Sequence, residues 1–429
     1  MKDKEADKKP ANKGSSLQPY LPGGRRMGEL KDMAQEVTAR SAALEGRVAP
    51  ETAAALGHHL RLINSYYSNL IEGHKTTIPD IESALRHHFH EDPEKQYAQE
   101  LCAAHVESEK TAMEAVLSEK APNICDFSFL SELHAAFYKS LPENHRFTHS
   151  GGGFTDIPVH PGRMRDVNVS VDGRFAHGPD PSQLPALMSR FAEVYAPEKH
   201  HGNERLIAMA ASHHRLTWLH PFRDGNGRVA RLFSGLYLAR AGINRANLWS
   251  LSRGLSRRKD RYMFELWVTD SPEEMPSDAS AEAHSGQAAG RFSGDLLAAF
   301  CEFFLSVCLD QIRFMENLLR LDQIESRIDW YVDMRSSDPA RPLRPEAARL
   351  LRAVFMRGSV SRGRAGEIMN MSQRNARRIV GSLVREGLLV SGSHRQPLSV
   401  GLPMHVLPYY FPDLYDPQVV GEEYMRRIR

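Results

Sequence analysis

The sequence predicts a mainly α-helical protein that contains one β-hairpin and ends in a small α+β module. Apolar residues recur at helical spacing through most of residues 27–141 and 181–268. Ahead of the C-terminal region, convincing strand alternation is confined to Val167-Asn-Val169-Ser-Val171, and Asp172-Gly173 directly after it favours a tight hairpin turn. Residues 343–401 then combine short helical segments with two strand-like ones. These observations favour a helical bundle with a separate C-terminal module.

Length and composition narrow the class of protein. A chain of 429 residues is long enough for two or three domains, and its 41% hydrophobic and 25% charged residues are typical of a soluble globular protein. No apolar run approaches the length that spans a membrane, and Met1–Lys13 lacks the apolar core of a signal peptide. The four cysteines have no metal-binding spacing, so we expect free thiols in a reducing cytoplasm: Cys102, Cys125, Cys301 and Cys308.

Charge is unevenly distributed along the chain. From residue 340 onward there are fifteen arginines, no lysine and seven acidic residues, a net charge of +8. Because the whole chain carries only +2, the part before residue 340 carries −6. This asymmetry predicts an anionic partner for the C-terminal module.

The N-terminal part is predicted to be helical after a polar start. Residues 1–26 are expected to be disordered, and the first helices cover about 27–44 and 50–72. The second of these ends in Ser68-Asn-Leu-Ile-Glu72-Gly73, where Ser68 and Glu72 share a face and Gly73 favours a helix stop. Pattern alone would leave Glu72 as a solvated residue. Further helices are expected over 77–85, 94–118 and 129–141, where His134 is interpreted as a core or surface histidine.

The densest concentration of polar chemistry is the run His220-Pro-Phe-Arg-Asp-Gly-Asn-Gly-Arg-Val-Ala-Arg231, between two apolar helical segments. Its turn offers backbone amides at the start of a helix, where they can converge on an anion: Gly225, Asn226 and Gly227. Arg228 and Arg231 share a helix face and can hold neighbouring phosphates. Asp224 can hold a divalent ion, and His220 can accept a proton. The run predicts a polyphosphate site.

This run resembles the signature of Fic-domain proteins, His-x-Phe-x-Asp/Glu-Gly-Asn-Gly-Arg-x-x-Arg, without a departure. The resemblance implies a Fic-type helical bundle with a β-hairpin flap, and transfer of AMP from ATP to a Ser, Thr or Tyr hydroxyl of a protein. It implies that His220 deprotonates the hydroxyl, Phe222 anchors the loop and Asp224 binds Mg²⁺ or Mn²⁺. It further implies an anion hole at Gly225–Gly227, with the β- and γ-phosphates on Arg228 and Arg231.

The segment Ser68–Gly73 resembles the Ser/Thr-x-x-x-Glu-Gly/Asn motif of Fic proteins that have an N-terminal inhibitory helix. That resemblance implies that Glu72 pairs with Arg231 and denies it to the γ-phosphate of ATP. A second hypothesis keeps the same site and reverses the reaction, with Glu72 orienting a water that removes AMP from a modified protein.

Two further expectations come from the resemblance. A flap after a Gly-x-x-Arg segment, here Gly162–Arg165, would register the backbone of a target protein by strand addition. Its residues would be Arg165, Val167, Val169 and Val171. A plain structural hairpin is the alternative, because hairpins are common connections. The basic segment 250–268 would lie near the nucleotide base, where Tyr262 could stack.

The remaining segments set the predicted domain boundaries. Residues 27–141 would form the N-terminal helical region and residues 142–268 the catalytic core. A flexible insertion is expected at 269–290, and one long helix within 291–335, spanning Phe292–Asp329, would pack on the core.

Residues 343–401 resemble a winged helix-turn-helix, with helices near 347–355, 364–369 and 372–385 and strands near 388–390 and 398–400. The third helix carries a set suited to DNA: Gln373, Arg374, Arg377, Arg378 and Arg385. The alternative is a module used for protein contact or to position the core, because a fold does not fix a function. The apolar tail, 402–429, is expected to dock on the rest of the protein. The partners expected are a protein substrate, which could be the chain itself, DNA and a second copy of the chain, with no membrane.

Overall fold

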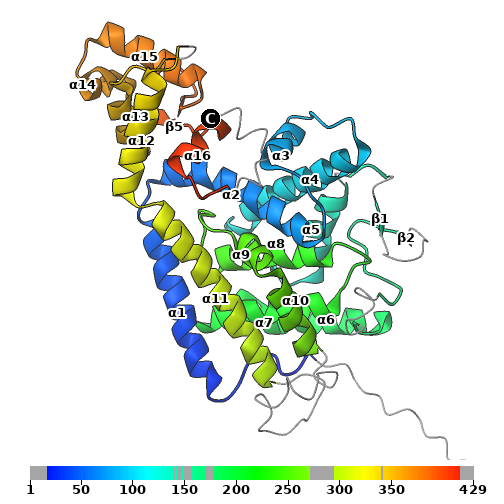
Figure 1. The fold of residues 1–429 in the computed structure, drawn as a ribbon. Coiled ribbons are helices and arrows are strands. Elements are labelled where there is room, and N and C mark those ends of the chain that lie inside the picture. The colour runs from blue at the N-terminus through cyan, green and yellow to red at the C-terminus, as the bar shows by residue number, and fades with distance from the viewer. Residues whose placement is uncertain are drawn as a thin grey trace, which may run out of the picture.

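The computed structural model describes residues 17–139, 141–143, 146–148, 157–169, 178–270, 294–339 and 342–415. The described part is mainly helical, which confirms the predicted fold class (Figure 1). The N-terminal helices are α1 (Arg26–Glu45), α2 (Pro50–Ile71), α3 (Ile78–Leu85), α4 (Pro93–Val116) and α5 (Phe127–Lys139). The central helices are α6 (Leu184–Tyr195), α7 (Glu204–Leu219), α8 (Asn226–Arg240), α9 (Leu251–Arg257) and α10 (Lys259–Asp270).

The helix α7 is the centre of the bundle. Nearly every residue from Leu206 to Leu219 is buried, because α7 is covered by α8, α6, α1 and α11 (Gly294–Leu318). A helix that is buried on nearly all sides must be surrounded by other helices in this way. Buried α7 therefore gives a fixed base for the loop that follows it at His220.

Helices α1 and α11 run side by side in the same direction along one flank of the bundle (Figure 1). Arg26 donates to the backbone oxygen of Asp295 at one end (3.2 Å), and Arg40 pairs with Glu316 at the other (2.9 Å). Residues 17–26 are part of the described structure, so the predicted disorder is wrong over this stretch. Leu17 is buried, and Arg215 on α7 donates to its carbonyl oxygen at 3.1 Å.

Two segments of the chain, one of which was predicted as a single long helix, are each divided into two helices. The long helix expected over Phe292–Asp329 is α11 followed by α12 (Leu321–Ser336). Arg320 between them is extended, and its side chain binds Asp322 at 3.0 Å, an acidic residue in the first turn of α12. A negative charge in that position favours the start of a new helix. The segment 250–268 is likewise divided into α9 and α10 at Arg258.

The β structure of the core differs from the prediction. Strands β1 (Phe147–Thr148) and β2 (Ile157–Pro158) pair antiparallel, upstream of the expected hairpin. Residues 167–169 are described and are not a strand, so the expected first strand is wrong over that stretch. Val171 and the Asp172-Gly173 turn lie outside the described residues, as does most of the insertion expected at 269–290.

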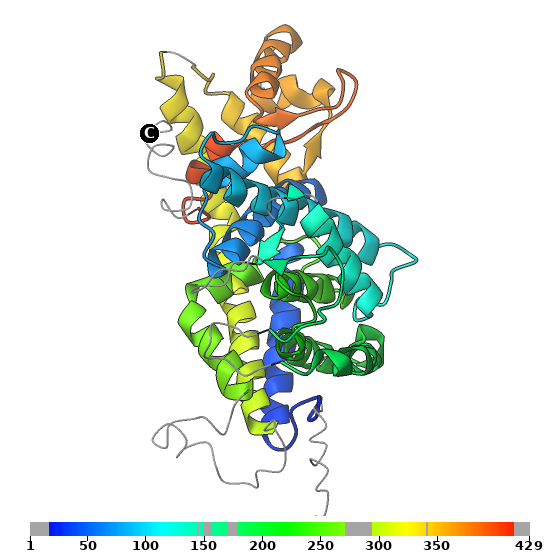
Figure 2. The same cartoon turned by 90° about the vertical axis from the view of Figure 1, so that its right-hand side faces the viewer.

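The C-terminal module contains α13 (Ala347–Arg357), α14 (Ala365–Met369) and α15 (Gln373–Arg385), close to the predicted bounds. Strands β4 (Leu389–Val390) and β5 (Leu398–Val400) are joined by β3 (Ser359–Val360), which sequence reasoning missed, in the order β3-β5-β4. Figure 2 shows the module at one end of the molecule, above the helical body.

The module and the start of the tail pack against the rest of the chain. Helix α16 (Leu407–Tyr410) lies on α12, where the rings of Tyr331 and Tyr410 are 5.7 Å apart. The module itself is seated on the N-terminal half of α2. Thr52 donates to the carbonyl oxygen of Phe355 at 2.8 Å, and His59 binds that of Leu402 at 2.7 Å. Helix α2 is thus shared by the module and the bundle.

Two smaller predictions can also be checked. Every one of the four cysteines is buried and free. Among the described residues, no helix is long and apolar enough to cross a membrane.

Candidate active site

The polar run that follows α7 forms the loop between α7 and α8. His220 ends α7 in the left-handed conformation (φ +48°), which turns the chain sharply away from the helix. Its Nδ1 lies 3.2 Å from the carbonyl oxygen of Thr217 and must therefore donate to it. That tautomer leaves Nε2 with its lone pair free. Burial lowers the pKa of His220, although the bond to Thr217 and the carboxylates of Asp224 and Glu72 oppose the shift. A neutral imidazole with a free Nε2 is suited to accept a proton.

Arg165 fixes the position of His220 from behind. Its guanidinium donates to four backbone oxygens, those of Val167, Pro179, Leu219 and His220. The bond to His220 is 2.7 Å, and Arg165 is only 2% exposed. Arg165 therefore anchors the loop between α7 and α8, which corrects its expected place on an exposed docking edge. Val167 is 38% exposed and Val169 is partly buried, so these two residues can still belong to the surface that was predicted to dock a target.

The loop is held in the core by Phe222 and Asn226. Phe222 is fully buried and stacks on the imidazole of His134 with ring centroids 4.0 Å apart. The side chain of Asn226 accepts from the backbone nitrogen of Phe222 at 2.9 Å and donates to its carbonyl oxygen at 2.8 Å. The Asn226 side chain thus shapes the turn, which leaves its backbone amide as the part available to an anion.

His134 has a structural role at this loop that the sequence did not reveal. Its Nδ1 accepts a hydrogen bond from the backbone nitrogen of Gly162 at 2.8 Å, so its Nε2 is the donor to the carbonyl oxygen of Asp224 at 3.1 Å. Burial lowers the pKa of His134 to about 4, which keeps this tautomer neutral. The expectation that His134 is a core histidine holds, but it also positions Asp224.

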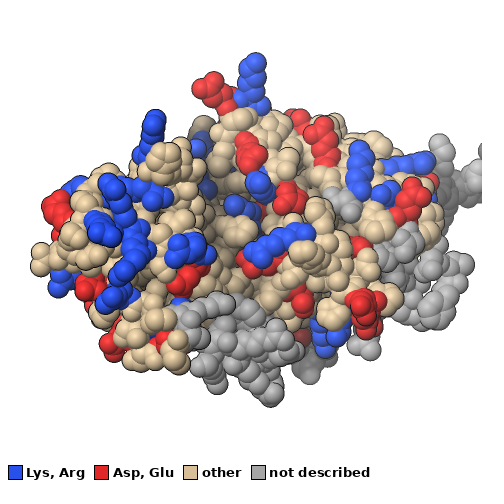
Figure 3. All heavy atoms as spheres, turned by 90° about the horizontal axis from the view of Figure 1, so that it is seen from above, with Lys and Arg blue, Asp and Glu red and all other residues tan. Residues whose placement is uncertain are grey.

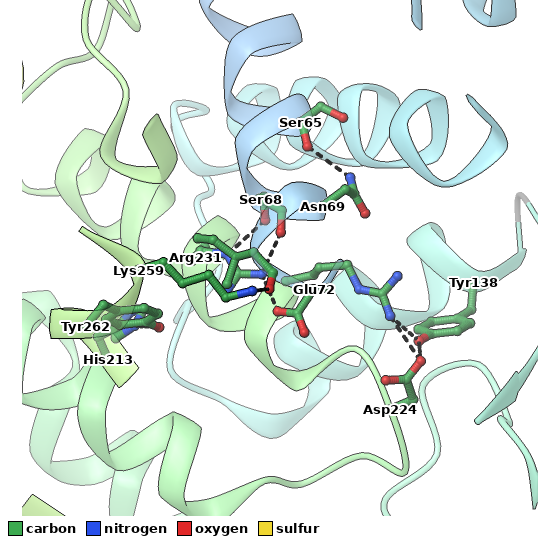
Figure 4. Close-up of polar contacts among 12 residues, drawn as sticks. Ser65, Ser68, Asn69, Glu72, Tyr138, His213, Asp224, Arg231, Lys259 and Tyr262 are labelled. Carbon is green, nitrogen blue, oxygen red and sulfur yellow. Dashed lines mark hydrogen bonds and ion pairs between the residues drawn. The ribbon is translucent and has the colours of Figure 1, made fainter. Parts of the chain in front are cut away.

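Asp224 is the carboxylate of the site. One oxygen accepts from the hydroxyl of Tyr138 at 2.6 Å and from Arg228 at 3.0 Å (Figure 4). Burial alone would raise the pKa of Asp224, but the charge of Arg228 and the bond from Tyr138 lower it below the ordinary value. The side chain is 38% exposed, so an ionised carboxylate faces the solvent-accessible side of the loop. Tyr138 was missed because it reads as one more apolar position of a helix.

The chemistry of Asp224 fits a magnesium ion brought in with a nucleotide. Among the described residues, no cluster of three histidine, cysteine or acidic side chains could form a metal cage. Mg²⁺ is commonly held instead by one or two carboxylates together with water and substrate phosphates. One exposed carboxylate beside an arginine therefore suits a metal that arrives with its phosphates.

Arg228 carries hydrogen-bond donors that no described residue fills. It is 3% exposed, and its Nε and Nη1 have no hydrogen-bond partner among the described residues. Its guanidinium lies 4.9 Å from the ring centroid of Phe137, and the hydroxyl of Tyr138 accepts from Nη2 at 2.9 Å. A buried cation with unpaired donors is costly unless an anion completes it. Arg228 is thus prepared for a phosphate.

Two glycines at the start of α8 allow side chains of other helices to lie close to its backbone. Gly225 is left-handed (φ +77°), and a Cβ there would collide with the ring of Tyr138. A Cβ on Gly227 would collide with the Glu72 carboxylate, which lies directly over this residue. The first amides of a helix have no carbonyl partner within it and attract anions. Glu72 therefore lies where an anionic ligand would bind.

Glu72 and Arg231 form an ion pair across 159 residues of sequence. Glu72 Oε1 lies 2.5 Å from Arg231 Nη2, while Ser68 accepts from the same guanidinium through its hydroxyl and its carbonyl oxygen, each at 2.9 Å (Figure 4). Arg231 is 3% exposed, whereas the Glu72 side chain is 34% exposed. Burial alone would raise the pKa of Glu72, but the charges of Arg231 and Arg228 lower it. Gly73 ends α2 directly after this pair.

Other side chains hold α2 in register with the site. Lys259 donates to the carbonyl oxygen of Ile71 at 2.6 Å, a favourable place for a cation at a helix C-terminus. Near the middle of α2, Asn64 donates to Glu109 on α4 at 3.1 Å, beside a cavity of about 30 Å³ behind Arg231. Burial raises the pKa of Glu109 to about 7. Helix α2 is therefore fixed at its end and near its middle.

Tyr262 does not occupy the position expected for stacking on a nucleotide base. It is 1% exposed, and its hydroxyl lies 2.8 Å from Nε2 of His213. The other nitrogen of His213 is bonded to Ser234 on α8 at 2.8 Å. Tyr262 thus belongs to a buried chain of hydrogen bonds beneath α8, which corrects the sequence-based expectation.

Comparison with known proteins finds a family model that matches the part of the chain containing this site. A family model described as the Fic/DOC family matches residues 125–238, which include the whole loop. The protein adenylyltransferase Fic of Culex quinquefasciatus is 39% identical over 85 residues, covering 20% of this chain and 17% of the relative. The relative of the same name from Drosophila willistoni is 26% identical over 169 residues, covering 34% of each protein. The chain thus spans about a third of the length of one of these curated relatives and less of the other.

Solved structures agree on the fold. A Fic family protein from Desulfovibrio desulfuricans G20 superposes with a TM-score of 0.50 at 18% identity, covering 90% of this chain and 99% of the other. Residues 134–508 of Fic-1 from C. elegans, carrying E274G, give a TM-score of 0.50 at 14% identity, covering 69% and 74%. The family match ends before the C-terminal module, whose assignment as a winged helix stays a prediction.

Proposed function

Because residues 125–238 match the Fic/DOC family model, we propose that the protein moves AMP from ATP to a hydroxyl group of a protein, and that Glu72 restrains this reaction. The observation that carries the proposal is the position of the Glu72 carboxylate, over Gly227 and on Arg231. A carboxylate there occupies a site whose donors suit a phosphate.

The triphosphate would be held by groups that already converge at the start of α8. Arg228 offers two nitrogens, Nε and Nη1, that have no partner among the described residues, and the first amides of α8 at the Gly225–Gly227 turn have no carbonyl partner within the helix. Arg231 would bind the terminal phosphate once Glu72 leaves it. Asp224 would hold Mg²⁺, which when bound neutralises charge on the phosphates.

His220 would act as the general base. Its Nε2 takes the proton of the target hydroxyl, whose oxygen attacks the α-phosphorus of ATP. The bond from that phosphorus to the bridging oxygen breaks, and pyrophosphate leaves. Arg165 and Thr217 keep the imidazole oriented during this step, because each is bonded to His220. Catalysis of this kind rests on positioning and on stabilisation of the transferring phosphoryl group.

Restraint would follow from competition for Arg231. A carboxylate and a γ-phosphate are both anionic, and two anions cannot share one guanidinium without repulsion. While Glu72 holds Arg231, ATP would either be excluded or bind without its terminal phosphate in place, which misplaces the α-phosphorus for attack.

The test is transfer of labelled AMP to proteins of a cell extract in the presence of Mg²⁺. Glu72→Gly should label proteins roughly 10- to 150-fold faster than the wild type, the equivalent of a charged hydrogen bond of about 1.5–3 kcal/mol. His220→Ala in the Glu72→Gly background should remove the labelling. Mass spectrometry of Glu72→Gly incubated with ATP alone would detect modification of the chain itself.

A matched variant separates the effect of removing the Glu72 charge from the effect of loosening the end of α2 with a glycine. Glu72→Gln keeps the size and helix propensity of the side chain but removes its charge. It should activate transfer as Glu72→Gly does. Equal labelling by the wild type and by both variants would contradict the restraining role of Glu72.

The reverse reaction is supported by one further feature of Glu72. Its Oε2 accepts no hydrogen bond from the described residues, and the side chain is one-third exposed, so this oxygen can hold a water molecule. The same site would then remove AMP from a modified protein. Offering AMP-modified protein to the wild type tests this, and release that is equally fast in Glu72→Gln would rule out Glu72 as the group that orients the water.

A further inference from the structure

The exposed face of α15 carries four arginines. At 100° per residue, Arg374, Arg377, Arg378 and Arg385 fall within one face, with Gly381 between them. The opposite face is buried in the module through Ala376, Ile379, Val380 and Leu383. Division of a helix into an apolar buried face and a cationic exposed face explains why α15 is stable in this position.

These arginines have no partners of their own. All four are exposed, and none forms an ion pair or hydrogen bond with another described residue. Most other arginines of the described chain do have a partner. Arg190, Arg313 and Arg320, for example, each pair with an acidic residue. The arginine face contains no acidic residue, so its charge is not neutralised locally.

The structure changes the set of contact residues expected from the sequence. The amide of Gln373 donates to the carbonyl oxygen of Gly363 at 2.7 Å and thus joins α15 to the turn before α14. The exposed loop between β4 and β5 adds Arg395 beside the same module. Figure 3, which views the molecule from the top of Figure 1, shows basic side chains gathered over the module end.

The arginine face has the dimensions of a groove-binding helix. From Arg374 to Arg385 the helix advances about 16 Å, and a helix about 10–12 Å across fits the major groove of B-form DNA, which is about 12 Å wide. Duplex RNA has a deep and narrow major groove that does not admit a helix. We infer that the C-terminal module binds duplex DNA through the arginine face of α15, a function separate from AMP transfer.

The experiment measures binding of the full chain to a labelled 30-base-pair DNA duplex by fluorescence anisotropy over a series of salt concentrations. The wild type should bind at low salt, and affinity should fall steeply as salt rises, because each phosphate contact releases counterions. The triple variant Arg374→Ala, Arg377→Ala, Arg378→Ala should bind at least roughly tenfold more weakly, with a log–log salt slope smaller by about three.

The matched control removes the same charge elsewhere. Arg190→Ala, Arg313→Ala and Arg320→Ala together lower the net charge by the same amount, from exposed ion pairs outside the module. This control should bind DNA as the wild type does, and thermal unfolding should show that both triple variants fold. No binding by the wild type at low salt would overturn the inference. So would equal weakening by the two triple variants, or equal binding to a duplex RNA of the same length.

Discussion

The two ends of α2 are held by opposite kinds of interaction. At its N-terminal half, α2 meets the module and the start of the tail mainly through neutral donors: Thr52 donates to the carbonyl oxygen of Phe355, and His59 donates to that of Leu402. The Glu51 carboxylate adds one hydrogen bond, which it accepts from Ser359 at 3.5 Å. Because Nε2 of His59 is the donor, its Nδ1 accepts from the hydroxyl of Tyr415 at 3.1 Å. At its C-terminal end, α2 meets the active site through the Glu72–Arg231 ion pair and Lys259.

The difference separates a permanent contact from an exchangeable one. A buried carbonyl oxygen that loses its donor has no ligand that takes the place of this donor. Breaking the contacts of Thr52 and His59 therefore costs free energy that ligand binding does not offset. Arg231, in contrast, can exchange a carboxylate for a phosphate, and both are ligands that a guanidinium binds well. Helix α2 is therefore anchored at the module and open to competition at the active site.

The largest effect is expected from removing charge at the active-site end. Glu72→Gln should tighten the binding of Mg²⁺–ATP by about 10- to 100-fold, because Arg231 no longer has to exchange one anion for another. Isothermal titration calorimetry measures this affinity directly. Glu51→Gln, which removes an exposed carboxylate from the first turn of the same helix, is the control and should leave the affinity unchanged. An unchanged affinity in Glu72→Gln would show that the ion pair does not compete with ATP.

The two ends also differ in how far the sequence revealed them. The Glu72–Arg231 pair was predictable because both residues belong to short runs that resemble Fic motifs, whereas pattern alone would have left Glu72 as a solvated residue. Under the proposed function, each of these side chains has a chemical task that restricts which residue can occupy its position. Loop anchors such as Tyr138 and His134 were not predictable, since a buried aromatic residue on an amphipathic helix has the same pattern whether or not its polar atom is used.

The module end of α2 could not be predicted for a physical reason. Thr52 and His59 bind backbone oxygens of Phe355 and Leu402, more than 300 residues away. Every residue has a carbonyl oxygen, so no sequence signal marks the acceptor. Local patterns also failed where tertiary contacts determine the burial of a side chain. The sequence places Arg165 in an exposed flap, but its guanidinium is buried on four backbone carbonyl oxygens around His220.

A smaller effect is expected from breaking one neutral contact at the module end. Thr52→Val keeps the size of the side chain but leaves the buried oxygen of Phe355 without its donor, which should reduce the free energy of unfolding by roughly 1–2 kcal/mol. Urea denaturation measures this change. Thr38→Val on α1 removes a bond to the carbonyl oxygen of Ala34 four residues earlier and should change stability by less than about 0.5 kcal/mol. An equal loss of unfolding free energy in both variants would mean that the contact of Thr52 with the module contributes no more to stability than a bond within one helix.

The smallest expected effect concerns pH, and it separates the two ends of α2 most cleanly. Burial lowers the pKa of His59 to about 4, whereas an unfolded histidine has a pKa of about 6.5. Between these values the unfolded chain binds a proton that the folded chain does not, so stability falls as the pH falls below about 6.5. Glu72 behaves differently: its folded pKa is lowered, so its contribution is fully present above the ordinary pKa of an unfolded glutamate, about 4.3, and is lost only at lower pH.

Acidification from pH 7.5 to 5.5 should therefore weaken the module end while leaving the active-site end intact. His59→Gln keeps a donor for Leu402 and an acceptor for Tyr415 but cannot titrate in this range. Over these two pH units the wild type should lose about 1 kcal/mol more unfolding free energy than His59→Gln, as measured by urea denaturation at both pH values. Other buried histidines, such as His105 and His213, titrate in both proteins and cancel in the difference. Identical pH dependence in the two proteins would show that protonation of His59 does not weaken its bonds to Leu402 and Tyr415.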